Sequence, residues 1–316
     1  MLVPTTKGFL MTLRFTVLAS GSAGNAAVVQ TASGSVLVDG GLQPRTLLER
    51  LSSQNLAAPS IRALLLTHTH GDHWNDALLG WLADGERLLY CHPSHHGKLN
   101  GSAQFQRLLQ AKLVRDYEAE KGFDLPAGLR ALPIPVRHDG GATFGFRLQG
   151  PANLFGEAVV LGYAADLGVW DEALLDAFQG VDLLALEFNH DVQLQIQSPR
   201  PRFLIERVLS DHGHLSNEQA ANFLRCLLKR ERSPRLTTLV QLHLSKECNR
   251  PELAQQAAQQ VVAELQTPLQ IHTARQERAM PLMDLTRRLR ARTKRPRKGS
   301  SQTAQPFLPG LLNEPS

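Results

Sequence analysis

The chain is organised around residues 64–73, LLLTHTHGDH. The short apolar run from residue 61 to residue 66 ends abruptly in a polar loop, which is typical of a buried strand. Residues i and i+2 of an extended segment point to the same side, so we expect His68 and His70 to leave the strand end together.

Asp72 and His73 follow one turn later, because Gly71 lets the backbone bend. Imidazole and carboxylate groups are ligands that Zn²⁺ and related divalent ions accept. Four such side chains are more than one four-coordinate ion easily takes from one short loop. The sequence therefore predicts two ions, with His68 and His70 on one and Asp72 and His73 on the other. The alternative, a solvated loop, is disfavoured by the buried strand directly before it.

The His-x-His-x-Asp-His order of residues 68–73 resembles the signature of the metallo-β-lactamase superfamily. The resemblance implies an α/β (α+β) fold, the four-layer αββα sandwich of two mixed sheets flanked by helices. It also implies further ligands downstream, each at the end of a strand. We expect one catalytic domain over residues 11–284, preceded by a disordered lead or mis-assigned start at residues 1–10.

Three later residues fit the implied ligands. His138 ends a segment that alternating prolines keep extended, and those prolines predict a position at a sheet edge. Asp166 follows an apolar strand and can bridge two cations, which repel unless an anion lies between them; capping a helix is its alternative role. His243 lies near the end of the last apolar strand. The implied ligand sets are His68, His70, His138 and Asp166 for one ion, and Asp72, His73, Asp166 and His243 for the other.

Four further motifs narrow the resemblance. Residues 20–25 (SGSAGN), 187–191 (EFNHD), 213–217 (GHLSN) and 243–245 (HLS), together with Asn249, resemble the bacterial YycJ-like (WalJ-like) subgroup. Members of that subgroup look like single-domain exonucleases that act on DNA. The resemblance therefore implies a nucleic acid, with DNA first, as substrate.

Substrate contacts are predicted around these motifs. The small-residue turn at residues 20–25 is either a plain hairpin or a phosphate-binding turn. Ser216 and Gln219 form a capping box, so a helix begins there and offers N–H groups to a phosphate. His214 either binds the phosphate, protonates the leaving oxygen or is structural; with Asp72 it is the catalytic candidate. The substrate-binding candidates are Ser22, Asn25, Asn189, His190, His214, Ser216 and Ser245.

Two carboxylates and one amide have open roles. Asp39 ends the third predicted strand and either orients a metal-binding histidine or caps a turn. Glu187 ends a later strand, where substrate contact or support of the ligands is favoured over ligation. Asn249 is expected to cap the helix that follows it.

The composition limits the class of protein. The 316 residues, 42% hydrophobic, are ordinary for a globular chain with a real core. Three scattered cysteines, Cys91, Cys226 and Cys248, indicate reduced thiols and a cytoplasmic location. The sequence contains no run of about twenty apolar residues, so it predicts no membrane-spanning helix.

The net charge of +5 is unevenly distributed. From Leu285 onward there are eight Lys and Arg and one acid, Glu314, a net charge of +7 that leaves −2 for the rest. We expect residues 285–316 to form a basic, disordered tail. It either binds nucleic-acid phosphates without sequence choice or is simply solvated, and the sequence leaves both open.

The predicted activity is a dinuclear metal-dependent hydrolase, a phosphodiesterase or nuclease of the DNA-exonuclease type that uses a metal-bridging hydroxide. Two divalent ions are expected, with Zn²⁺ first and Mn²⁺ or Fe²⁺ compatible with the same ligands. The alternatives are a thioester or ester hydrolase of the glyoxalase II type and a binding protein that keeps the fold without catalysis.

Overall fold

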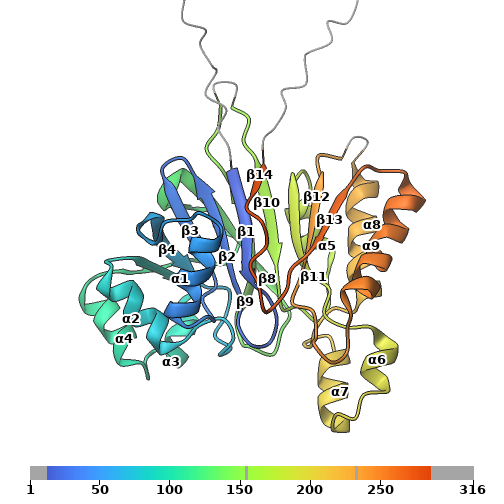
Figure 1. The fold of residues 1–316 in the computed structure, drawn as a ribbon, viewed down its shortest axis with the longest axis horizontal. Helices are drawn as coiled ribbons and strands as arrows, with labels where there is room; N and C mark the ends of the chain where they lie inside the picture. The colour runs from blue at the N-terminus through green and yellow to red at the C-terminus, as the bar shows by residue number, and fades with distance from the viewer. Residues whose placement is uncertain (1–12, 154–155, 232–233, 286–316) are drawn as a thin grey trace, which may run out of the picture.

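The computed structural model describes residues 13–153, 156–231 and 234–285. Two seven-stranded sheets pack face to face, and helices cover the outer face of each (Figure 1). The predicted four-layer αββα sandwich is confirmed. The predictions for residues 1–10 and for the basic tail, Leu285 aside, fall outside the described residues. No helix in the described part of the chain is long and apolar enough to cross a membrane.

The first sheet has the strand order β14-β1-β2-β3-β4-β5-β6. Its strands β3 to β6 run parallel, and the remaining neighbours are antiparallel. The strands are β1 (Leu13–Ala19), β2 (Ala26–Thr31), β3 (Gly34–Val38), β4 (Ile61–Leu65), β5 (Leu88–Cys91), β6 (Val114–Asp116) and β14 (Met283–Leu285). The helices on this side are α1 (Pro44–Ser53), α2 (Asp76–Asp84), α3 (His96–Leu99) and α4 (Ala103–Gln110), with 3₁₀ turns at Ala58–Ser60 and Pro93–His95.

The second sheet has the order β13-β12-β11-β10-β9-β8-β7, and β10 to β13 run parallel. The strands are β7 (Phe123–Leu125), β8 (Leu129–Val136), β9 (Thr143–Gln149), β10 (Val160–Ala164), β11 (Leu183–Glu187), β12 (Thr238–Leu242) and β13 (Gln270–Thr273), with a 3₁₀ turn at Pro126–Gly128. The helices are α5 (Glu172–Phe178), α6 (Val192–Ile196), α7 (Arg202–Leu209), α8 (Asn217–Arg230) and α9 (Pro251–Leu265).

Three apolar layers hold the sandwich together. The middle layer lies between the sheets and includes the fully buried Phe15 and Phe146. A second layer fills the space between the second sheet and its helices, around Phe178 and Phe223. A third lies between the first sheet and α1, α2 and α4, around Phe105. Burial of these side chains supplies most of the driving force for folding.

The carboxyl ends of the parallel strands meet at one edge of the sandwich, where ligand sites of such sheets commonly form. Three residues that follow these strands have left-handed backbone: Asp39 after β3 (φ 58°), Asp166 after β10 (φ 59°) and His243 after β12 (φ 54°). Non-glycine residues with positive φ are uncommon and concentrate at functional sites. The backbone therefore turns sharply at the end of each of these three strands.

Two local predictions are wrong. Strand β8 is not the edge of its sheet, because the short β7 pairs with residues 129–131; its prolines, Pro133 and Pro135, lie beyond that pairing. Asn249 does not cap α9, whose N-cap is Arg250 without a side-chain bond. The Asn249 amide instead donates hydrogen bonds to the carbonyl oxygens of Phe188 and Asn189.

Candidate metal centre

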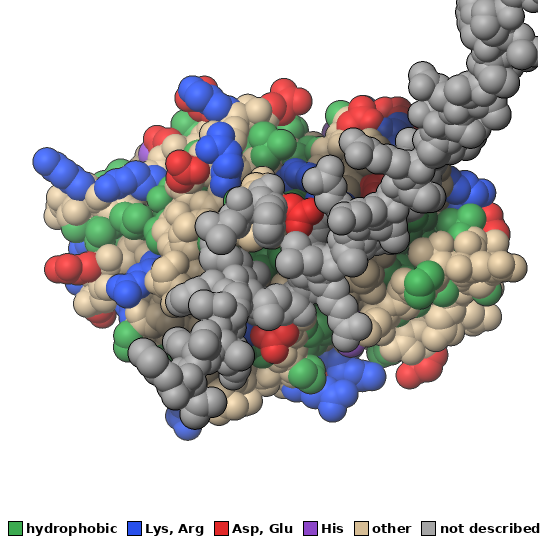
Figure 2. Space-filling view, turned by 90° about the horizontal axis from the view of Figure 1, so that it is seen from above, with side chains coloured by type: hydrophobic (Ala, Val, Ile, Leu, Met, Phe, Trp, Pro, Cys, Tyr) green, Lys and Arg blue, Asp and Glu red, His purple; other side chains and the backbone are tan. Residues whose placement is uncertain are grey.

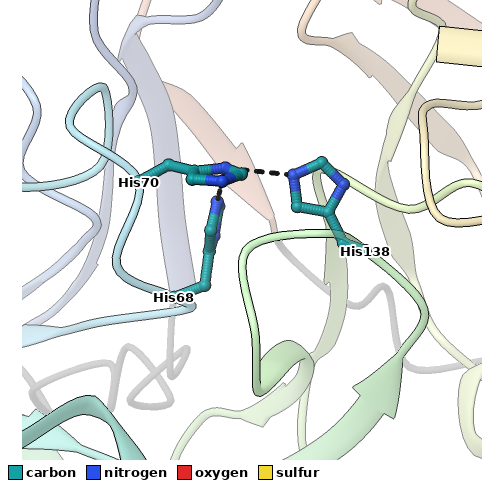
Figure 3. Close-up of side chains that lie close together, drawn as sticks. All are labelled: His68, His70 and His138. Atoms are coloured by element: carbon teal, nitrogen blue, oxygen red, sulfur yellow. Dashed lines mark hydrogen bonds between the residues drawn. The ribbon is translucent and has the colours of Figure 1, made fainter. Parts of the chain in front are cut away.

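One cluster of imidazoles comes from two loops that are far apart in the sequence. His68 and His70 follow β4, and His138 follows β8 (Figure 3). Nδ1 of His70 lies 3.1 Å from Nε2 of His68 and 3.2 Å from Nε2 of His138. Three nitrogens therefore converge on one point, as the sequence predicts for these histidines.

The second cluster lies beside the first. The candidate ligand atoms of Asp72, His73 and His243 all lie within 4.8 Å of one another, and so do those of His68, His73 and Asp166. Nε2 of His243 is 3.4 Å from Oδ2 of Asp72. Asp166 is 1% exposed, and its alternative role as a helix cap is wrong because Asp171 caps α5. All seven predicted side chains thus meet at one edge of the sandwich.

The outer hydrogen bonds determine which imidazole nitrogens carry protons. Nδ1 of His138 donates to the carbonyl oxygen of Gly213 (2.9 Å), and Nδ1 of His73 donates to the Asp39 carboxylate (2.8 Å). A neutral imidazole has one N–H, so each Nε2 carries a lone pair. This is the arrangement found in metal-ligating histidines.

In His68 and His243, too, Nδ1 donates a hydrogen bond to a protein acceptor. The Thr67 hydroxyl donates to Asp39, so its oxygen accepts from Nδ1 of His68 over 2.9 Å. Nδ1 of His243 donates to Glu187 over 3.0 Å. In both rings Nε2 is left as the acceptor that faces the centre. The prediction that Asp39 stands behind a histidine is thus consistent with its contacts.

Lone pairs that face each other require a cation between them. Oδ2 of Asp166 is buried, makes no hydrogen bond among the described residues and lies 2.9 Å from Nε2 of His73. Without a proton or a metal ion between these two acceptors, their contact would be repulsive. The donor set of imidazole and carboxylate therefore fits divalent metal ions.

Burial and charge give the two clusters opposite proton affinities. Burial lowers the pKa of His68, His70 and His138, which favours the neutral form that binds metal. Burial alone would also lower the pKa of His243, but Asp166, Asp72 and Glu187 raise it to about 10. In the absence of metal, protons take the place of cations among these carboxylates.

Glu187 is more central than the sequence indicated. Its fully buried carboxylate accepts from Nδ1 of His214 (2.8 Å) and of His243 (3.0 Å), and from the backbone N–H groups of Leu167 and Leu215. Burial opposes ionisation, but the charge of His214 and the hydrogen bonds from His214 and His243 lower the pKa of Glu187 to about 2. Glu187 and His214 also lie within ligand distance of Asp166 and His243. No sequence motif predicted the contact between Glu187 and His243, which depends on β11 lying beside β12.

A cleft of about 430 Å³ opens beside the second cluster. Of the residues predicted to bind substrate, four line it: Ser22, Asn189, His214 and Ser245. His243 forms part of the same wall, so the cleft ends at the candidate metal centre.

Three other predicted substrate residues do not line this cleft. Asn25 is buried, and its amide donates to Oδ2 of Asp72 (3.1 Å) and contacts Nε2 of His73 (3.0 Å). Ser216 is buried and caps α8 in the predicted capping box, which occupies its hydroxyl. His190 is 1% exposed, with no partner for either ring nitrogen among the described residues. Asn25 is placed to support the ligands, and the geometry gives Ser216 a structural role.

A two-sheet αββα sandwich with histidines and carboxylates gathered at one edge defines the metallo-β-lactamase class of hydrolase. A sequence-family model described as "Beta-lactamase superfamily domain" matches residues 35–235. The chain belongs to this superfamily, and it is a hydrolase of the metallo-β-lactamase fold.

Relatives and solved structures agree with this assignment. Exodeoxyribonuclease WalJ of Streptococcus pneumoniae serotype 2 is 29% identical over 244 residues, covering 76% of this chain and 85% of the relative. Exodeoxyribonuclease YycJ of Bacillus anthracis is 27% identical over 262 residues, covering 80% and 90%. The metallo-beta-lactamase fold protein YhfI from Bacillus subtilis has the same fold, with a TM-score of 0.60 at 16% identity over 85% of this chain and 99% of that one. The predicted YycJ-like resemblance is confirmed.

Proposed function

We propose that the chain is a dinuclear metal-dependent phosphodiesterase that cleaves DNA. The observation that carries the proposal is the convergence of seven side chains at one point, with four of the five imidazoles, those of His68, His73, His138 and His243, each donating from Nδ1 to a protein acceptor. The similarity to two proteins named exodeoxyribonucleases supports DNA as the substrate.

The seven side chains would bind two ions. His68, His70 and His138 would hold one ion, Asp72, His73 and His243 the other, and Asp166 would lie between them. When bound, such ions act as Lewis acids and lower the pKa of a water molecule enough to make it a nucleophile near neutral pH. Asn25 donates to Oδ2 of Asp72 and would hold that carboxylate in place for the second ion.

His214 is the residue best placed to act on the substrate. Its Nδ1 is engaged by Glu187, so Nε2 is the nitrogen available in the cleft. We propose that Nε2 binds the phosphate or donates a proton to the leaving oxygen. Ser22, Asn189 and Ser245 line the same wall and would contact the substrate around the reacting phosphate.

The test compares two substrates and two variants. The metal-replete full chain should degrade DNA and show no comparable turnover of a glutathione thioester. Asp72→Ala should abolish DNA cleavage without unfolding the protein, whereas Asp84→Ala, an exposed carboxylate paired with Arg107, should cleave at the parent rate. Thioester turnover without DNA cleavage would replace the proposal with the glyoxalase-type alternative.

A further inference from the structure

Helices α6 and α7 project beyond the second sheet, at the lower end of the sandwich in Figure 1. Three residues of α7, Leu204, Arg207 and Val208, line the cleft whose inner wall includes His214 and His243. Helix α7 therefore forms one wall of the cleft that reaches the candidate metal centre.

This projection exposes apolar side chains. Three of the four exposed large hydrophobic residues of the described chain lie on it: Ile196 (53% exposed), Phe203 (71%) and Leu209 (39%). A phenylalanine that stays exposed to water lacks the favourable free energy that burial would provide. Phe203 precedes Arg207 by four residues, so the two side chains are neighbours on the helix surface beside the cleft.

The same segment is locally basic. Residues 192–210 contain three arginines and one glutamate, a net charge of +2, whereas residues 1–284 together sum to −2. The face of the molecule in Figure 2, by contrast, has both charge signs interspersed over its described residues. An excess of positive charge beside an exposed aromatic ring is typical of surfaces that bind single-stranded nucleic acid.

Two of these arginines lie in the cleft and keep free donors. Arg200 donates to Glu247 over 2.8 Å and to the Ser245 hydroxyl over 3.5 Å, and Arg207 donates to the Asp139 carboxylate. A guanidinium has five N–H donors, so one carboxylate partner leaves several for a phosphate. Oδ1 of Asp139 is 3.7 Å from Nε2 of His70, which ties Arg207 to the candidate metal centre.

We propose that α7 holds the unpaired end of a DNA strand, with a base stacked on Phe203 and the adjoining phosphates on Arg200 and Arg207. The inference rests on the proposed phosphodiesterase function and names the form of its substrate. Stacking on an aromatic ring tolerates any base, because every base has a π face. The platform would therefore hold a strand end without selecting its sequence.

The experiment measures binding and cleavage separately. With metal chelated, Phe203→Ala should weaken binding of a fluorescent single-stranded oligonucleotide about tenfold, within the range expected for loss of one stacked base. With metal present, KM should rise by a similar factor while kcat is kept. Phe203→Trp should retain binding, whereas Phe203→Leu, which keeps apolar area but loses the ring, should behave like Phe203→Ala. Ile196→Ala is the matched control and should bind like the parent.

Oligonucleotides with one abasic position give the decisive comparison. Moving the abasic site along the strand should reveal one position where the parent loses about tenfold and Phe203→Ala loses nothing further. Equal losses in both proteins at every position would overturn the platform. So would a parent protein that dimerises in sedimentation experiments through Phe203, since a second copy would then cover the ring. Binding that behaves as predicted, together with no DNA cleavage, would refute the proposed function and leave the platform intact.

Discussion

Oδ2 of Asp39 accepts a hydrogen bond from Nδ1 of His73 over 2.8 Å, and both groups are fully buried. The same carboxylate accepts from the backbone N–H and the hydroxyl of Thr67, which in turn accepts from His68. One carboxylate thus orients an imidazole of each cluster. Support of this kind is commonly worth 10- to 100-fold in metal affinity.

Asp39→Asn should therefore weaken metal binding by roughly 10- to 100-fold, because the amide cannot accept from both Thr67 and His73 as the carboxylate does. Competition with a chelator of known affinity measures the change. Asp84→Asn, on an exposed helix end, is the control. Unchanged affinity in Asp39→Asn would show that the contact does not orient the ring.

Glu187 and His214 should act as one unit. Glu187→Gln would leave Nδ1–H of His214 facing an amide, so DNA cleavage should fall at least about tenfold as the acid–base contribution of His214 is lost. His214→Gln should lower it by a similar or larger factor, and the double variant should be no slower than the worse single one. Cleavage rates of the parent, the two single variants and the double variant test this. Strictly multiplicative losses would show that Glu187 and His214 act independently.

A histidine outside the centre gives a pH dependence of stability. Burial lowers the pKa of His95 to about 4, and its Nε2–H donates to the carbonyl oxygen of Ala142. The folded pKa lies below the unfolded value of about 6.5, so the unfolded chain binds the proton first and stability falls as pH drops from about 6.5 to about 4.

The loss from this one group is about 3 kcal/mol over that window. Urea unfolding of metal-free protein at pH 7 and pH 4.5 measures it. His95→Gln should be less stable than the parent at pH 7 and should lose less stability on acidification. Equal losses in parent and variant would mean that His95 titrates normally when folded.

Cysteine reactivity tests the packing of the first sheet. Cys91 is fully buried at the end of β5, and burial together with the neighbouring Asp116 carboxylate raises the pKa of its thiol well above the usual value. A thiol that stays protonated is a poor nucleophile, so Cys91 should resist iodoacetamide at pH 8. Cys226, which is partly exposed on α8, should be alkylated. Mass spectrometry of peptides from native protein locates the label, and rapid labelling of Cys91 would contradict this packing.

The elements that the sequence predicted best are those with a strong local signal. The apolar run before His68 is β4 within one residue, and Ser216 with Gln219 marked the start of α8. The short strands β6, β7, β13 and β14 were missed, because three or four partly exposed residues carry little periodicity.

Candidate ligands could be predicted where they directly follow an apolar strand. Contacts between side chains from distant parts of the chain could not be predicted. His138, Asp166 and His243 each sit at such a strand end. The contact of Asn25 with His73 joins residues 48 positions apart, and only the pairing of strands brings them together. The sequence alone leaves the turn that holds Asn25 open between a plain hairpin and a phosphate-binding turn.

The proposed function requires seven side chains to hold two divalent cations at one edge of the sandwich. Metal content per chain, measured by plasma mass spectrometry on metal-replete full-length protein, tests it most directly. We predict close to two ions per chain for the parent and for Asp84→Asn, and one or fewer for Asp166→Asn. A parent that retains no metal, or an Asp166→Asn protein that keeps both ions, would contradict the proposed two-ion centre.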